Sequence, residues 1–122
     1  MALQIINGPF IQPDESLSDA IDCSGGPLVR ITMPGAWTNA NLTFQLSSDG
    51  AMYNDLYDVH GDPVTIVVRA GGTVRIPLEW STMIAWLKFR SGTPENPVAQ
   101  QELREFAVAI EAEPPAMARL GH

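Results

Sequence analysis

The sequence predicts an all-β protein: an antiparallel β-sandwich of the jelly-roll type, with one short helical turn near the C-terminus. In most candidate segments apolar and polar residues alternate with a period of two, which sends successive side chains to opposite faces of a strand. Clusters of glycine and proline lie between these segments, which recur about every 8 to 12 residues, a spacing typical of all-β domains. Eight or more short strands of this kind bury their apolar faces best as two packed sheets.

The first half of the chain shows the clearest alternation. In the segments Leu28–Met33 and Leu42–Ser47, apolar residues such as Leu28 and Phe44 can point inward while their neighbours face water. Before them, the pattern predicts strands at Gln4–Asn7, Phe10–Gln12 and Leu17–Asp22. Glycine and proline clusters between the segments predict turns, because glycine adopts positive φ and proline lacks the N–H that a sheet ladder uses.

The second half contains a predicted hairpin. Segments 64–69 and 73–78 flank Ala70-Gly71-Gly72, and each carries three alternating apolar residues that can face one core. These residues are Val64, Ile66 and Val68 in the first arm and Val74, Ile76 and Leu78 in the second. The same pattern predicts strands at Met52–Tyr57, Val64–Arg69, Thr73–Leu78, Ile84–Arg90 and Arg104–Glu111.

Helix-forming residues gather in the segment Pro97–Ala109, where the apolar side chains do not form a clean helical stripe. We therefore expect a short helical turn at Val98–Leu103 that leads into the last strand. The segment from Pro114 to His122 holds little that a core could bury. The chain is thus expected to form one domain over residues 1–112, followed by an extended tail over residues 113–122.

Composition argues against several classes of function. The chain carries 14 acidic and 7 basic side chains, and 14 minus 7 leaves a net charge of −7, so a nucleic-acid partner is not expected. No apolar run reaches the roughly 18 to 20 residues of a membrane span, and the first residues lack the basic start of a signal peptide. A single cysteine, Cys23, can form no internal disulfide. These features indicate synthesis in a reducing cytoplasm, without a membrane partner.

The sequence shows no recognisable catalytic set. His60 lies in a glycine turn and His122 at the terminus, which is a poor basis for a triad or a zinc site. Four aspartates near strand ends could offer oxygen ligands to calcium, but no D-x-D-x-D-G loop is present, and a solvated loop face is expected instead. These are Asp49, Asp55, Asp58 and Asp62. No phosphate-binding glycine motif occurs either. We therefore expect no enzyme, no metal and no cofactor.

Three tryptophans are candidate contact residues, because aromatic rings on loops can stack on sugars or anchor protein partners. Trp37 lies in the polar loop Met33–Asn41, close to Asn39 and Asn41, and either plugs the core between the sheets or makes an exposed contact. Trp80 lies at a predicted sheet rim, where a buried side chain and an exposed contact are equally expected. Trp86 shares one face of its strand with Ile84 and Lys88, and Ala85, Leu87 and Phe89 share the other, so one of these sets must be external.

The stretch Ala40–Tyr57, ANLTFQLSSDGAMYNDLY, resembles the strand-turn-strand of discoidin-like, galactose-binding-type jelly rolls. The strand Ile84–Arg90, IAWLKFR, resembles their penultimate strand. With Trp37–Asn41, Arg90–Thr93 and Pro97–Gln101, the layout over Ile31–Ile110 is similar to small structural proteins of tailed phages and prophages. The sequence departs from the sugar-binding members: Ala51 follows the Asp-Gly turn where they carry tryptophan, and their terminal cysteine pair is absent. The resemblance thus implies an architecture more than a sugar-binding task.

This resemblance, with the missing catalytic set, predicts a non-enzymatic virion protein, made in the host cytoplasm, that decorates a capsid or sits at a fibre base. We expect it to be oligomeric or present in many symmetric copies and to bind major capsid or fibre subunits. Candidate contacts are Leu3 and Ile5, which could add a strand to a neighbour's sheet, and Pro114 and Pro115 in the tail. The alternative is a carbohydrate-binding module or adhesin that uses Trp37, Asn39 and Asn41, with Trp80 as a further contact.

Overall fold

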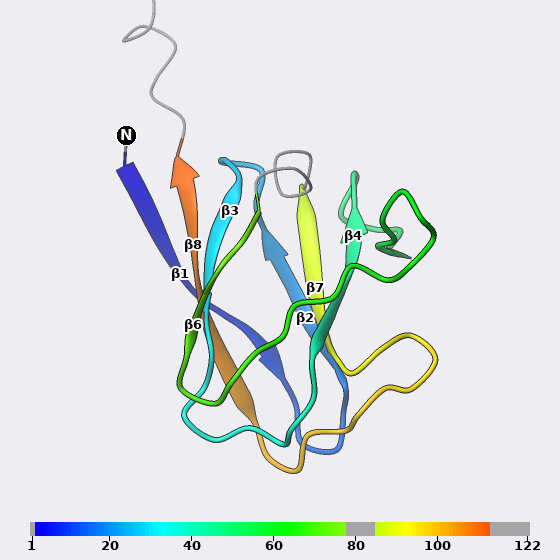
Figure 1. Cartoon of the computed structure of the whole chain (residues 1–122). Coiled ribbons are helices and arrows are strands. Elements are labelled where there is room, and N and C mark those ends of the chain that lie inside the picture. Colours follow the sequence, from blue (N-terminus) through cyan, green and yellow to red (C-terminus); the bar gives the residue numbers. More distant parts are fainter. Residues whose placement is uncertain (1, 78–84, 113–122) are drawn as a thin grey trace, which may run out of the picture.

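The computed structural model describes residues 2–77 and 85–112, which form eight strands and no helix. The strands are β1 (Ala2–Ile11), β2 (Leu17–Asp22), β3 (Leu28–Thr32), β4 (Leu42–Ser47), β5 (Asn54–Asp55), β6 (Thr73–Arg75), β7 (Trp86–Ser91) and β8 (Arg104–Ala112). They make two antiparallel sheets of four strands, ordered β1-β8-β3-β6 and β2-β7-β4-β5, which face each other (Figure 1). The predicted antiparallel β-sandwich is confirmed.

The strand pairing has the order of a jelly roll. β1 pairs with β8, β2 with β7, β3 with β6 and β4 with β5, as if one long hairpin had been rolled up. Successive strands therefore alternate between the two sheets along most of the chain. The first and last strands lie side by side, and their pairing extends from Ala2 opposite Ala112 to Ile11 opposite Arg104 (Figure 1).

A chain of aromatic rings fills the centre of the core. Phe89 of β7 contacts Phe44 of β4 and Phe106 of β8 edge to face, with ring centroids 5.4 Å and 5.1 Å apart. Phe106 in turn contacts Trp37, in the loop before β4, at 5.5 Å. These contacts tie strands of both sheets together and add to the burial of apolar area. The aliphatic side chains around them include Ile11, Leu28, Ile31, Leu42, Leu87, Val108 and Ile110.

Several strand predictions differ from the structure in extent. The predicted strand Val64–Arg69 does not form, since only Ile66 makes an isolated bridge, to Leu42, and the predicted strand Thr73–Leu78 is represented in the described residues by Thr73–Arg75 of β6. The predicted segments Gln4–Asn7 and Phe10–Gln12 fall on one strand, β1, which ends at Ile11. Its register shifts between Asn7 and Phe10, where Gly8 has a φ of 124°. The predicted strand Met52–Tyr57 shrinks to the two residues of β5. Its first residue is held in a turn, because the Asp49 carboxylate accepts the backbone N–H of Met52 that a strand would need.

The predicted hairpin around Ala70-Gly71-Gly72 is wrong. A turn does form there, with the N–H of Gly72 bonded to the carbonyl of Arg69 at 3.0 Å, but its two arms join different sheets. Ile66 forms an isolated bridge to Leu42 of β4, whereas β6 pairs with β3 (Figure 1). The predicted inward faces are nevertheless right: Val68 and Ile76 are buried, and Val64, Ile66 and Val74 pack against the core. Leu78 lies outside the described residues.

The predicted helical turn at Val98–Leu103 is absent too. Its backbone groups are taken by distant partners: the N–H of Val98 bonds to the carbonyl of Ser91, and the N–H of Gln100 to that of Glu15. The carbonyl of Gln100 accepts from the N–H of Asp14 at 2.7 Å. These bonds hold the segment extended against the end of β7, so the local bonds of a helical turn cannot form. The predicted tail, 113–122, lies outside the described residues.

The central ring of the aromatic chain should dominate stability. Replacing Phe89, which is fully buried, by alanine removes both edge-to-face contacts and leaves a cavity, so Phe89→Ala should lower the free energy of unfolding by about 3 to 5 kcal/mol. Urea denaturation followed by tryptophan fluorescence measures this loss. The control is Val59→Ala, because Val59 is 96% exposed and should change little. Equal losses in the two variants would contradict the assignment of Phe89 to the centre of the core.

Candidate interaction surface

The two sheets, as far as the structure describes them, have four edge strands: β1, β6, β2 and β5. Three of them are short or charged. β6 has three residues and ends in Arg75, β5 has two and includes Asp55, and β2 carries Asp19 and Asp22. β1 has ten residues, ALQIINGPFI, without an ionisable side chain. Proteins usually protect a sheet edge with charges, proline or shortness, and in the first six residues of β1, Ala2–Asn7, these protections are missing.

We call the segment Ala2–Asn7 the β1 edge. It carries two exposed apolar side chains, Leu3 at 54% and Ile5 at 55% exposure. Ile6, which alternates with them, packs against the core cluster, so Leu3 and Ile5 lie on the outer face of the sheet. Beyond Asn7 most of the strand is covered by the rest of the protein, since Gly8, Pro9 and Ile11 are buried. The β1 edge is therefore the part of the strand that a partner can reach.

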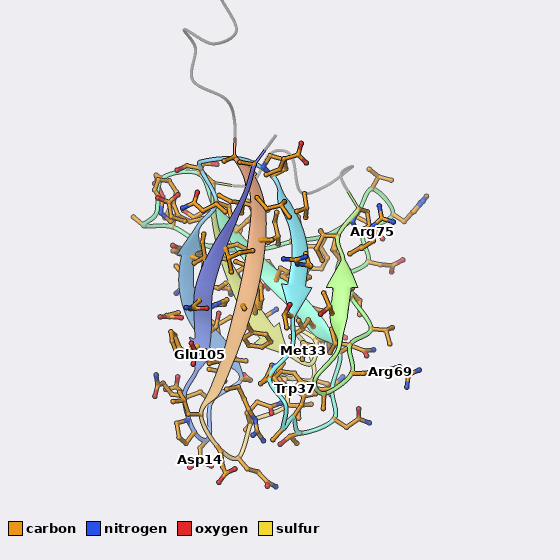
Figure 2. All side chains as sticks on the ribbon, turned by 90° about the vertical axis from the view of Figure 1, so that its left-hand side faces the viewer. Asp14, Met33, Trp37, Arg69, Arg75 and Glu105 are labelled. Atoms are coloured by element: carbon orange, nitrogen blue, oxygen red, sulfur yellow. The ribbon has the colours of Figure 1, made fainter. Side chains whose placement is uncertain are left out.

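The outer face beside the β1 edge carries small side chains at its centre. Leu3 and Ile5 stand opposite Glu111 and Ala109 of β8, and the next residue of β8 on this face is Ala107. Further across, Arg30 of β3 stands opposite Arg75 of β6, and Thr32 opposite Thr73. Figure 2 shows this sheet from outside, with β1 and β8 in front. Small side chains in the middle of the face leave Leu3 and Ile5 as its largest apolar groups.

Trp37 has a mostly internal role in the structure. Its indole N–H donates to the carbonyl of Ala40 at 3.0 Å, and its ring packs partly buried against Phe106. Of the two alternatives left by the sequence, this geometry fits the plug between the sheets (Figure 2). Asn39 and Asn41 are exposed. Three other predicted contact residues, Trp80, Pro114 and Pro115, lie outside the described residues.

A buried amide, Gln100, holds the Trp37 loop in place. Its side chain accepts the N–H of Thr38 at 2.8 Å and donates to the carbonyl of the same residue at 3.0 Å. It also donates to the hydroxyl of Ser91 at 2.7 Å and accepts from the Arg104 guanidinium at 3.0 Å. Gln100 thus links β7, β8 and the loop. Sequence reasoning missed this role, and its one signal was a glutamine inside the segment 97–101.

The second sheet also settles which face of β7 is external. Leu87 and Phe89 are fully buried, and Trp86 and Lys88 are half-buried on the outer face. The Lys88 ammonium lies 4.4 Å from the centroid of the Tyr53 ring, a cation–π contact. This outer face is thus occupied by contacts within the chain itself.

A second polar contact on the same face pairs Arg90 with Asp55. Their side chains are 9% and 30% exposed. The hydrogen bond from the Arg90 guanidinium holds the pKa of Asp55 below its ordinary value. Gln45 donates to the same carboxylate at 3.2 Å. The pair therefore fixes β5 against the outer side of β4 and β7.

Two of the four aspartates in the predicted acidic group organise their own turns. The Asp49 carboxylate accepts N–H bonds from Met52 at 3.0 Å and Ala51 at 2.8 Å, which, with the Ser47 hydroxyl, lower its pKa to about 2. The Asp58 carboxylate accepts the N–H groups of Asp62 and His60, and these bonds lower its pKa too. Over residues 2–77 and 85–112, no group of three or more His, Cys, Asp or Glu side chains could hold a metal ion.

The lone thiol lies in the core. Cys23 is 1% exposed, and its burial raises the pKa of its thiol to about 12, so the thiol stays protonated.

No helix in the described part of the chain is long and apolar enough to span a membrane. The chain matches no protein-family model, no curated protein and no solved structure. The β1 edge is therefore assigned as the candidate site on geometry and composition.

Gln100 should be essential for stability although it is polar. Gln100→Leu removes the partner of four polar groups on Thr38, Ser91 and Arg104, and buried groups left unpaired should lower the free energy of unfolding by about 2 to 4 kcal/mol. Amide hydrogen exchange at Thr38 should accelerate in the variant, because its N–H loses its acceptor. Gln101→Leu is the matched control, since Gln101 is exposed. Unchanged exchange at Thr38 in Gln100→Leu would contradict this role.

The hydrogen bonds to Asp49 should make the stability of the fold depend on pH in the acid range. The pKa of Asp49 is about 2 in the folded protein and 3.8 in the unfolded chain. At a pH above 3.8, the pKa of Asp49 in the unfolded chain, its ionised carboxylate stabilises the fold fully. This contribution to the free energy of unfolding is lost as the pH falls towards 2. Asp49→Asn should flatten the fall in melting temperature over this pH range, because the amide does not titrate. Carboxyl NMR titration of the wild type measures the pKa directly, and a midpoint near 3.8 would contradict the turn geometry.

Proposed function

We propose that this protein is a non-enzymatic structural component of a phage or prophage virion. It decorates the capsid or sits at the base of a head or tail fibre, and it binds other virion proteins. The observation that carries the proposal is the β1 edge, an uncharged and exposed strand edge on a strongly acidic chain. The resemblance of Ile31–Ile110 to small phage structural proteins supports the same role.

Strand addition is the binding mode that the β1 edge favours. The outward backbone N–H and C=O groups of an edge strand can pair with a strand of a neighbour, which gives affinity without a deep pocket. Leu3 and Ile5, each more than half exposed, would lose contact with water in the same step. Because β1 is already an ordered strand, little conformational entropy is lost when a partner binds. Most of the free energy gained from strand pairing and apolar burial therefore contributes to affinity.

The fold supports the proposal to a lesser degree. Jelly rolls occur in viral capsid proteins and in lectins, so the topology is compatible with both the virion role and the carbohydrate-binding alternative. Sugar binding through Trp37 finds less support, because its N–H and its ring already make contacts inside the protein, to the Ala40 carbonyl and the Phe106 ring. Asn39 and Asn41 remain exposed and could still bind a polar ligand. A glycan array with the wild type and Trp37→Phe tests this alternative.

The virion role predicts that the chain copurifies with particles. Phage particles are induced from cells that encode a tagged chain, purified on a density gradient, and analysed by quantitative mass spectrometry. We expect a constant ratio of the chain to the major capsid protein across the particle peak. The double variant Leu3→Lys/Ile5→Lys should lose at least about tenfold of this signal, because charged side chains, lysine above all, protect a strand edge from pairing with another strand.

The matched control is Met52→Lys/Val59→Lys, which adds the same charge at two exposed apolar residues far from β1 in sequence. This variant should copurify as the wild type does. Absence of the wild-type chain from purified particles would refute the virion role. Equal loss in both double variants would show that added charge, and not the β1 edge, determines the binding.

A further inference from the structure

We propose that the partner of the β1 edge is a second copy of this chain. The two β1 strands pair antiparallel across a twofold axis, so that two sheets of four strands become one continuous sheet of eight. This inference rests on the proposed function, in which the β1 edge binds protein, and it names the partner. A twofold contact uses the same surface on both copies, so that surface must complement itself.

Charge selects this surface for contact between identical copies. Each copy carries a net charge of −7, so two copies repel each other unless acidic surfaces stay apart. Pairing two β2 edges would bring together the two aspartates of each, Asp19 and Asp22. Pairing two β6 edges would oppose the positive charges of Arg75. In the β1 edge, residues 2–7 carry no charge, so two copies can approach there without like charges in the paired strands.

The register follows from the alternation of side chains. Leu3 and Ile5 lie on the outer face, and Ala2, Gln4 and Ile6 have the opposite parity. If Gln4 lies on the twofold axis, Leu3 of each copy faces Ile5 of the other, and Ala2 faces Ile6. The four side chains of Leu3 and Ile5 then form one apolar patch over the joint. If Ile5 lay on the axis, Leu3 would face the polar Asn7, so the first register buries more apolar area.

The length of the free segment limits the strength of the contact. Pairing ends near Asn7, since the following residues Gly8 and Pro9 are buried in their own copy. One short strand pair buries less than the about 1,200 Å² typical of stable interfaces, so we expect a weak, reversible dimer. In a particle with many copies, such contacts add to others and become effective. Higher salt should strengthen the dimer, because it screens the repulsion between the acidic copies.

Sedimentation analysis of the full chain over a wide range of concentration tests the dimer. The wild type should shift from monomer to dimer as concentration rises. Leu3→Lys and Ile5→Lys should each weaken the association by at least about tenfold, because each puts two lysines into one joint. Val59→Lys, at a residue 96% exposed on a loop, should dimerise as the wild type does. Since all three residues are exposed, circular dichroism should show intact folding in each variant.

A scan of single cysteines over positions 2 to 7 tests the register independently. The natural Cys23 is buried and will not compete. With Gln4 on the axis, residue 4 of one copy lies opposite residue 4 of the other, within reach of a disulfide. Oxidative cross-linking should therefore peak at Gln4→Cys and fall at both neighbouring positions. A flat profile, or stronger cross-linking of Val59→Cys, would overturn the twofold pairing.

The outcomes separate this inference from the proposed function. If the chain stays monomeric at every concentration but copurifies with particles through Leu3 and Ile5, the β1 edge binds a different virion protein and the inference is refuted. If the chain dimerises through the β1 edge but is absent from particles, the inference holds and the virion role is refuted. A dimer that is insensitive to Leu3→Lys and Ile5→Lys would also refute the inference.

Discussion

The burial of one apolar layer between two sheets is the constraint on which the rest of this structure depends. Phe89 connects Phe44 and Phe106 across the layer, and every strand that contributes to it must turn its apolar side chains inward. Outer faces and loops are then free to carry polar groups, and several of these are fixed by buried partners such as Gln100 and Arg90. The β1 edge differs from the rest of the two sheets, because its apolar side chains Leu3 and Ile5 are exposed within a strand, whereas the exposed Met52, Val59 and Val67 lie outside the strands.

Much of this architecture could be predicted from alternation alone, because a period of two identifies the buried face of a strand without knowledge of its partner. Val68 and Ile76 were therefore assigned correctly to the core, although the hairpin that should have joined them does not exist. Strand partners are decided by the topology of the whole chain. The helical turn expected at 98–103 failed for a related reason, since backbone groups of Val98 and Gln100 bond to distant segments.

The candidate site was predictable in part. Leu3 and Ile5 stood out as apolar residues in an uncharged segment, and the structure places both on an exposed strand edge. Trp37 could not be resolved from its sequence context, because a loop tryptophan can point inward or outward with the same neighbours. The glutamine at position 100 was too weak a signal, since a buried amide and an exposed one look alike in a single sequence. Two basic side chains, Arg90 and Arg104, are almost buried, so the solvent meets an even more acidic surface than the composition suggests.

The pairing order also has a consequence for biosynthesis. Two inner strands of the sheets, β7 and β8, come last in sequence among the described strands, and they separate β2 from β4 and β1 from β3. The sheet β2-β7-β4-β5 cannot close until residues 86–91 have left the exit tunnel, and the sheet β1-β8-β3-β6 cannot close until residues 104–112 have followed, so the nascent chain cannot complete either sheet strand by strand. During translation the earlier strands wait without their main partners, and this is the period in which the chain most needs protection from aggregation.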